Sequence, residues 1–215
     1  MKLTLIACAL ALGLSLSATT SLLAADPPAP ATAAAAPAAP QLHTAMRALW
    51  QGHVQHTREY AIAVKGGNAQ AAKNAADDVV RNAKSIANAV GGFYGAAAGE
   101  QMLTLLGGHW GGVKAMTDAE QAGDTAAVNK AMNGLTANAD AIATFLSGAN
   151  PNLPDDAVRG LMMAHVGHHS AQIREIMSGD MQAEATTWKA MRAHMDVLAD
   201  ALAGGIAKQF PAKAT

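Results

Sequence analysis

The sequence predicts an all-α fold in which three αα-hairpins form an antiparallel six-helix bundle with approximate threefold internal symmetry. Two observations lead to this prediction. After residue 40, apolar residues recur at alternating steps of three and four, as they do on the buried face of a helix. The same pattern returns every 56 residues, which is typical of a chain built from repeated supersecondary units.

The 56-residue period is clearest at three histidines, His53, His109 and His165, which occupy the same place in each copy. A second polar position repeats as Asn82, Asn138 and His194. Apolar residues around both positions align as well, among them Leu49, Leu105 and Leu161; Val79, Leu135 and Met191; and Ile86, Ile142 and Leu198. Each copy therefore predicts one hairpin, and the three hairpins span residues 41–92, 97–148 and 154–208.

The first helix of each predicted hairpin carries one stripe of core-facing residues with a histidine near its middle. These stripes are Met46-Trp50-His53-Thr57-Tyr60-Val64, Met102-Leu106-His109-Val113-Met116 and Val158-Met162-His165-His169-Gln172-Ile176. The return helices carry shorter stripes of the same spacing, namely Val79-Asn82-Ile86-Val90, Leu135-Asn138-Ile142-Leu146 and Met191-His194-Leu198-Leu202.

Turn residues mark the ends of these helices. Gly67-Asn68, Gly123-Asp124 and Gly179-Asp180 each combine a glycine suited to a left-handed helix end with a residue suited to the next N-cap. Between hairpins, Gly91-Gly92 and Asn150-Pro151 are expected to end a helix.

Residues 1–25 have the order of a secretory signal, with Lys2 followed by an apolar run and small residues near Ala25. The run is too short for a good membrane span. Asp26–Pro40 is rich in proline and alanine, which predicts a disordered tether before a bundle at 41–211. We therefore expect a periplasmic or secreted protein with no integral membrane segment once the signal is removed.

Composition excludes several classes of site. The only cysteine is Cys8, so signal removal would leave neither disulfides nor thiolate ligands. Lysine and arginine are scattered and the formal net charge is −1, which argues against nucleic acid as a partner. No Walker loop, dinucleotide fingerprint, Gly-x-Ser-x-Gly or haem-attachment motif is present.

Distances from the predicted turns place polar residues at equal heights within each hairpin. His53 and Asn82 are equally far from the first turn, as are His109 and Asn138 from the second. His165 and His194 have the same relation to the third turn. If the hairpins close around one axis, all six residues are expected to share a layer of an otherwise apolar interior.

Such a layer suggests a transition-metal site, because neutral imidazole is a common ligand for copper, zinc and non-haem iron. The expected ligands are His53, His109 and His165, with His194 as a possible fourth. Asn82 and Asn138 would orient the imidazoles by hydrogen bonds. An ion could be shared if facing nitrogens approach within roughly 3–4 Å, and separations beyond about 8 Å would exclude it.

Two other interpretations stay open. A repeat copies its ancestor, so a triplicated His–Asn hydrogen bond in a scaffold or interaction protein would give the same pattern. A third interpretation is a metal enzyme in which a histidine-bound ion activates water or oxygen. No organised general acid or base is visible, so an enzyme is the less favoured interpretation.

Further histidines are possible accessory ligands. His56 and His168 align three residues after His53 and His165, and His169 lies one helical turn after His165 on the same face. Methionines near the layer, including Met162 and Met191, suit copper but also suit an alanine-rich core.

The chain also resembles a group of small exported bacterial helical proteins of unestablished function, whose members often carry automatic names such as acetylglutamate kinase or glycosyltransferase. The resemblance rests on Leu49-Trp50-x-x-His53-Val54-x-x-Thr57-Arg58, Tyr94-Gly95-x-Ala97-x-Gly99, His109, the segment from Ala137 to Asn152, His165 and Lys208-Gln209-Phe210-Pro211. It covers nearly all of the expected mature chain and implies a helical bundle and export. The sequence shows no nucleotide or sugar-nucleotide site that would support either name. Lys84 and His56 depart from the usual pattern of the group.

Overall fold

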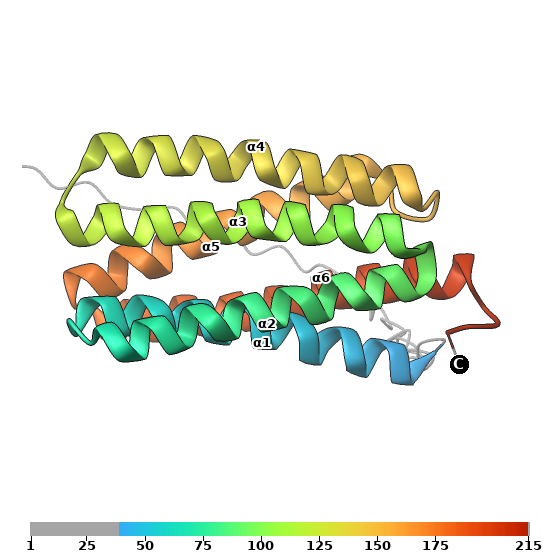
Figure 1. The fold of residues 1–215 in the computed structure, drawn as a ribbon, viewed down its shortest axis with the longest axis horizontal. Coiled ribbons are helices and arrows are strands. Elements are labelled where there is room, and N and C mark those ends of the chain that lie inside the picture. The colour runs from blue at the N-terminus through green and yellow to red at the C-terminus, as the bar shows by residue number, and fades with distance from the viewer. Residues whose placement is uncertain (1–38, 215) are drawn as a thin grey trace, which may run out of the picture. The chain divides into compact units, whose positions relative to one another are not determined.

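The computed structural model describes residues 39–214, and this part of the chain folds into six α-helices (Figure 1). Their bounds are α1 Pro40–Lys65, α2 Ala69–Tyr94, α3 Ala96–Ala122, α4 Thr125–Ala149, α5 Asp155–Ser178 and α6 Met181–Gln209. The predicted signal at 1–25 and all but the last two residues of the predicted tether lie outside the described residues. None of the helices described combines the length and apolar character needed to cross a membrane.

The six helices form the predicted antiparallel bundle, and the bundle is closed. Each helix packs against the next one in the chain, and α6 packs back against α1 (Figure 1). The first helices of the three hairpins, α1, α3 and α5, also contact one another. Closure therefore directs one face of each of these three helices toward a shared centre, whereas α2, α4 and α6 bridge the gaps between them.

The turns within the hairpins use the residues that the sequence indicated. Gly123 and Gly179 end α3 and α5 in the left-handed conformation, with φ of 68° and 82°. Asn68 and Asp124 cap α2 and α4 by accepting hydrogen bonds of 3.0 Å from the backbone N–H groups of Ala71 and Ala127. Asp180 does the same for α6.

Two helix ends differ from the prediction. The first helix already begins at Pro40, within the expected tether. The second helix does not stop at Gly91-Gly92 but continues to Tyr94, and the chain turns at Gly95 with φ of 94°. Gly91 instead lies against Gly99 of α3, and the close packing requires glycine at 99, where a Cβ would lie 3.0 Å from the carbonyl oxygen of Ala87 and 3.2 Å from the Cα of Gly91.

The repeated polar residue of each return helix forms the same hydrogen bond in all three hairpins. The side-chain amide groups of Asn82 and Asn138 donate to the carbonyls of Leu49 and Leu105, at 2.9 and 3.0 Å. Nε2 of His194 lies 2.9 Å from the carbonyl of Leu161. Each bond spans 33 residues and joins the two helices of one hairpin near their middle.

Glycine makes room for two of these bonds. A Cβ on Gly52 or Gly108 would lie 3.0 Å from the side-chain nitrogen of Asn82 or Asn138. The third hairpin has Ala164 at the corresponding position, and there the imidazole of His194 reaches the carbonyl of Leu161 at 2.9 Å. Glycine therefore precedes the core histidine in the two hairpins where asparagine forms the bond, and alanine precedes it in the hairpin where histidine does.

The seam between α1 and α6 is the one place in the ring of described helices where adjacent helices are not joined by a loop. Side-chain contacts close it instead. Arg58 donates two hydrogen bonds, of 2.6 and 2.8 Å, to the buried carboxylate of Glu184, which also accepts one of 2.9 Å from Gln172 of α5. Arg47 pairs with Asp200 farther along the same seam.

We predict that Gly108→Ala and Gly107→Ala will have opposite consequences, although both glycines are exposed and adjacent in α3. Alanine at 107 meets nothing within 4 Å and should stabilise the fold by about 0.5–1 kcal/mol, because glycine is a poor helix former. Alanine at 108 displaces the side chain of Asn138 and so breaks its hydrogen bond to the carbonyl of Leu105. The free energy of unfolding of Gly108→Ala should therefore be lower than that of Gly107→Ala by about 1 kcal/mol or more. Urea unfolding measures both values, and equal stabilisation would show that the Asn138 bond contributes nothing.

Candidate metal centre

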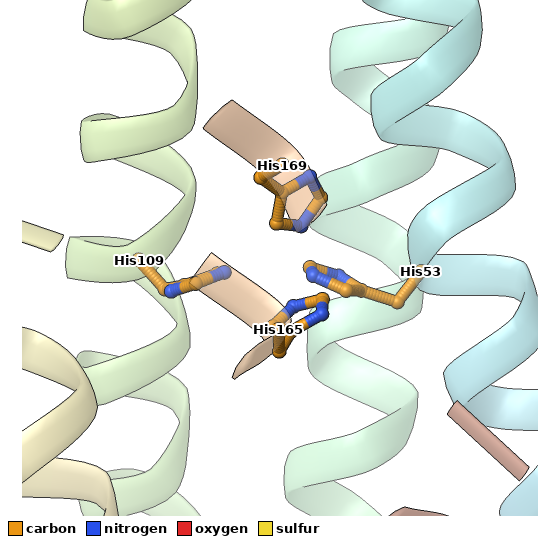
Figure 2. A group of neighbouring side chains, drawn as sticks. All are labelled: His53, His109, His165 and His169. Atoms are coloured by element: carbon orange, nitrogen blue, oxygen red, sulfur yellow. The ribbon is translucent and has the colours of Figure 1, made fainter. Parts of the chain in front are cut away.

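Four buried imidazoles meet at the centre of the bundle (Figure 2). They come from α1 (His53), α3 (His109) and α5 (His165 and His169), the three helices that contact one another across the middle. Each histidine is at most 2% exposed. We call these four residues the histidine cluster.

The repeat explains three members of the cluster, and helix geometry explains the fourth. His53, His109 and His165 lie at the middle of the core stripe of their helices, and closure turns these stripes toward one another. His169 follows His165 by four residues, so both side chains project from the same face of α5. The cluster therefore takes one histidine from each of the first two hairpins and two from the third.

The nitrogens of the cluster lie close enough to converge on one ion. One ligand nitrogen from each residue can be chosen such that all four lie within 4.8 Å of one another. This is well inside the limit of about 8 Å that would exclude a shared ion, although it exceeds the separation of about 3.3–3.4 Å set by a tetrahedral ion with bonds of 2.0–2.1 Å. Binding would require the rings to move inward by rotation about their side-chain bonds.

The four rings are arranged as an irregular tetrahedron. The separations between ring centroids are 5.7 Å for His53–His109 and His53–His165, and 5.9 Å for His53–His169. The remaining three are 5.3 Å for His109–His165, 5.6 Å for His109–His169 and 4.4 Å for His165–His169. A square would make two of the six separations much longer than the other four, so this arrangement is not planar.

Apolar packing excludes water from one side of the cluster. Trp50, Leu106 and Met162 lie one helical turn before the three repeated histidines, and each is at most 2% exposed. The indole of Trp50 meets the imidazole of His53 edge-on, with centroids 6.1 Å apart. On the other side, Thr57 and Val113 occupy the positions equivalent to His169, and both are buried.

Burial keeps these imidazoles uncharged. Desolvation lowers the pKa of His53 to about 3, with further lowering from His109 and His56. The same cause lowers the pKa of His109 to about 4. For His165 and His169 desolvation is the largest cause and the neighbouring imidazoles add to it, so that both pKa values lie well below the ordinary value of 6.5. All four rings are therefore neutral at pH 7, and each offers a free lone pair.

Most polar atoms of the cluster have no hydrogen-bond partner. Both ring nitrogens of His53, His109 and His165, and Nε2 of His169, are buried and unpaired. An unsatisfied buried polar group costs about 1–3 kcal/mol. Seven such atoms together destabilise the core considerably. Coordination of an ion by the lone pairs of these nitrogens would remove much of this free-energy cost.

The expected hydrogen bonds between asparagine and histidine are not well formed. The side-chain nitrogens of Asn82 and Asn138 are directed to backbone carbonyls, and their Oδ1 atoms are buried without a partner. The Asn138 side chain lies near enough to His109 to raise the pKa of that imidazole in part, against the larger effect of burial. No ring nitrogen of His109 reaches good hydrogen-bond geometry, so this contact is at most a weak orienting one.

The other predicted histidines lie outside the cluster. His194, expected as a possible fourth ligand, is directed to the carbonyl of Leu161 and is not among the four histidines that converge, whereas His169, expected as a possible accessory ligand, is one of them. His168 lies beside His194, with ring centroids 5.3 Å apart, and is half-buried. His56 is partly exposed and its Nδ1 lies 3.0 Å from a carboxylate oxygen of Glu59.

The signal for His169 was present in the sequence as its four-residue spacing from His165. It was expected only as an accessory ligand because the repeat does not extend to it, and the equivalent positions hold Thr57 and Val113. Comparisons with protein-family models, curated proteins and solved structures gave no match to this chain. The function is therefore inferred from the geometry of the cluster.

We predict that the metal-free protein loses stability as the pH falls below about 6.5. In the unfolded chain each histidine has its ordinary pKa of 6.5, whereas the folded values for His53 and His109 are about 3 and 4. The unfolded state binds more protons in this window, so the stability present above pH 6.5 declines toward pH 4, by up to about 1.4 kcal/mol per pH unit for each histidine. Thermal unfolding with a chelator present, between pH 4 and 8, measures the decline, and a flat profile from pH 6.5 to 5 would contradict it.

We also predict that His109→Leu stabilises the metal-free protein, by about 1–3 kcal/mol, because two unpaired buried nitrogens are replaced by an apolar group of similar size. His194→Leu is the matched control. It removes a formed hydrogen bond and should destabilise the fold by about 1 kcal/mol. Urea unfolding in the presence of a chelator compares them, and a destabilised His109→Leu would indicate that His109 serves packing.

Proposed function

We propose that this protein binds one transition-metal ion through His53, His109, His165 and His169. The observation that carries the proposal is the convergence of four neutral, buried imidazoles whose nitrogens have almost no other partner. Imidazole nitrogen is a common ligand for zinc, copper and iron. The tetrahedral arrangement of the rings favours ions that accept four ligands in this geometry, such as zinc(II) and copper(I).

The proposed role is to hold the ion and not to catalyse a reaction on it. Catalytic sites keep a coordination position open for water or substrate, whereas structural sites use four protein ligands. Here four ligands are available, and each is at most 2% exposed. These features support a closed site.

A scaffold whose polar layer serves packing alone is less well supported. That interpretation requires the core histidines to satisfy their nitrogens through asparagine or other protein groups. Seven of these nitrogens have no such partner, and Asn82 and Asn138 bond to backbone carbonyls instead. A core selected only for stability would gain by replacing these histidines with apolar residues.

We further infer that the ion is bound outside the cytoplasm. The support is the order of residues 1–25, in which Lys2 precedes an apolar run and a small-residue cleavage region. Export of this kind leads to the periplasm or to the medium.

The proposal predicts one bound ion per chain and a specific loss in the variant His109→Ala. Removing one of four ligands should weaken binding more than the roughly 10–100-fold that loss of an outer hydrogen-bonding partner costs. Cobalt(II) is a suitable probe, because its visible absorption reports tetrahedral coordination. Untagged protein would be titrated with cobalt(II) and zinc(II), and the stoichiometry confirmed by elemental analysis.

His56→Ala is the control for this titration, because His56 lies outside the cluster and is partly exposed. It should bind as tightly as the unchanged protein. Equal loss in both variants would point to adventitious binding at surface histidines, and a protein that takes up neither cobalt(II), zinc(II) nor copper(I) would rule out the proposal.

A further inference from the structure

The ligand set of the cluster carries no negative charge. No carboxylate or thiolate belongs to the group of ligand atoms that lie within 4.8 Å of one another. The four histidines are the whole group, and neutral imidazole adds no charge to an ion that it binds. A bound ion would therefore keep its full charge.

The shell around the cluster supplies no anion either. In metal sites the second nitrogen of a ligand histidine usually donates to a carboxylate or a carbonyl. Both nitrogens of His53, His109 and His165 are without any hydrogen-bond partner. Among the described residues, the negative charge that commonly compensates a divalent ion is thus absent both from the ligand set and from the hydrogen-bond partners of the imidazoles.

The buried carboxylate that could compensate the ion is already neutralised. Among the described residues, Glu184 is the only acidic residue in the buried class. Its carboxylate is held by two hydrogen bonds from Arg58 and one from Gln172. The carboxylate and the guanidinium together contribute no net charge to the interior.

The charge of the ion then decides how well it suits this site. The free energy lost when an ion leaves water for a region of low dielectric grows with the square of its charge. A divalent ion therefore loses about four times as much as a monovalent ion of similar size. Four imidazoles can replace part of the hydration of either ion, but they add no negative charge to offset the additional charge of a divalent ion.

The arrangement of the rings also favours copper(I) over copper(II). Copper(II) prefers square-planar or tetragonal arrangements, whereas the four rings lie at the corners of an irregular tetrahedron. Copper(I) and zinc(II) both accept tetrahedral coordination. Of these two, copper(I) carries the smaller charge.

We propose that the cluster selects a monovalent metal ion, copper(I), over zinc(II) and over copper(II). This selectivity rests on the metal-binding function proposed above and adds the charge class of the ion. It has a measurable consequence for bound copper, because every tenfold preference for copper(I) over copper(II) raises the reduction potential of the couple by about 59 mV.

The experiment compares monovalent and divalent ions in the untagged protein without oxygen. Copper(I) and zinc(II) would be titrated against chelators of known affinity, and silver(I) would serve as a monovalent ion that does not change oxidation state. We expect one copper(I) or silver(I) per chain, held at least about a hundredfold more tightly than zinc(II), and a bound copper couple at a correspondingly high potential. Equal or tighter binding of zinc(II) would overturn the selectivity and leave the metal-binding function standing, whereas failure to bind any of these ions would overturn both.

A pair of variants at one ligand tests whether charge is the cause. His169→Asp places a carboxylate in the cluster and should shift the preference toward zinc(II) by about a hundredfold or more. His169→Asn removes the same imidazole without adding charge and should weaken both ions without that shift. Circular dichroism and thermal unfolding of the metal-free variants establish that both are folded, and equal zinc preference in the two variants would refute the role of charge.

Discussion

The contact of α6 with α1 is the constraint on which the rest of the structure depends. Three hairpins placed side by side in an open array would leave the first helices of the outer hairpins far apart. Closure brings α1, α3 and α5 against one another and turns their core stripes toward the same centre. The meeting of His53, His109 and His165 follows from that closure, because they lie at the same height on those stripes.

The centre created in this way is chemically unlike the core around it. The layer on one side of it, formed by Trp50, Leu106 and Met162, is apolar and buried. The imidazoles of the centre have lost water without gaining hydrogen bonds. Burial keeps the rings neutral and leaves their lone pairs free, which are the two conditions that a metal ligand must meet.

Much of the fold could be predicted from the sequence, because helical periodicity, turn residues and a repeat all indicate the same elements. The second helix continues past Gly91-Gly92 to Tyr94, and Gly91 lies against Gly99 of α3, so glycine in a sequence does not distinguish a helix end from a helix contact. Packing of this kind depends on the partner helix, which local patterns do not specify.

The structure brings together some of the predicted site residues and not others, and this difference has one physical origin. Counting residues from a turn gives the height of a residue along the bundle but not the direction of its side chain. Asn82, Asn138 and His194 lie on bridging helices and are directed to the backbone of their own hairpin, so they do not complete the cluster. His169 completes it because it shares a face of α5 with His165, a relation within one helix that does not require knowledge of the fold.

The position of the seam in the chain has a consequence for how the centre can be reached. All four histidines lie on helices that precede α6, so the whole donor set has been synthesised before the last helix exists. Every other pair of neighbouring helices is tied by a loop, whereas α6 meets α1 only through side chains such as Arg58 and Glu184. Separation of these two helices would open the ring with every turn intact and would give access to the buried cluster.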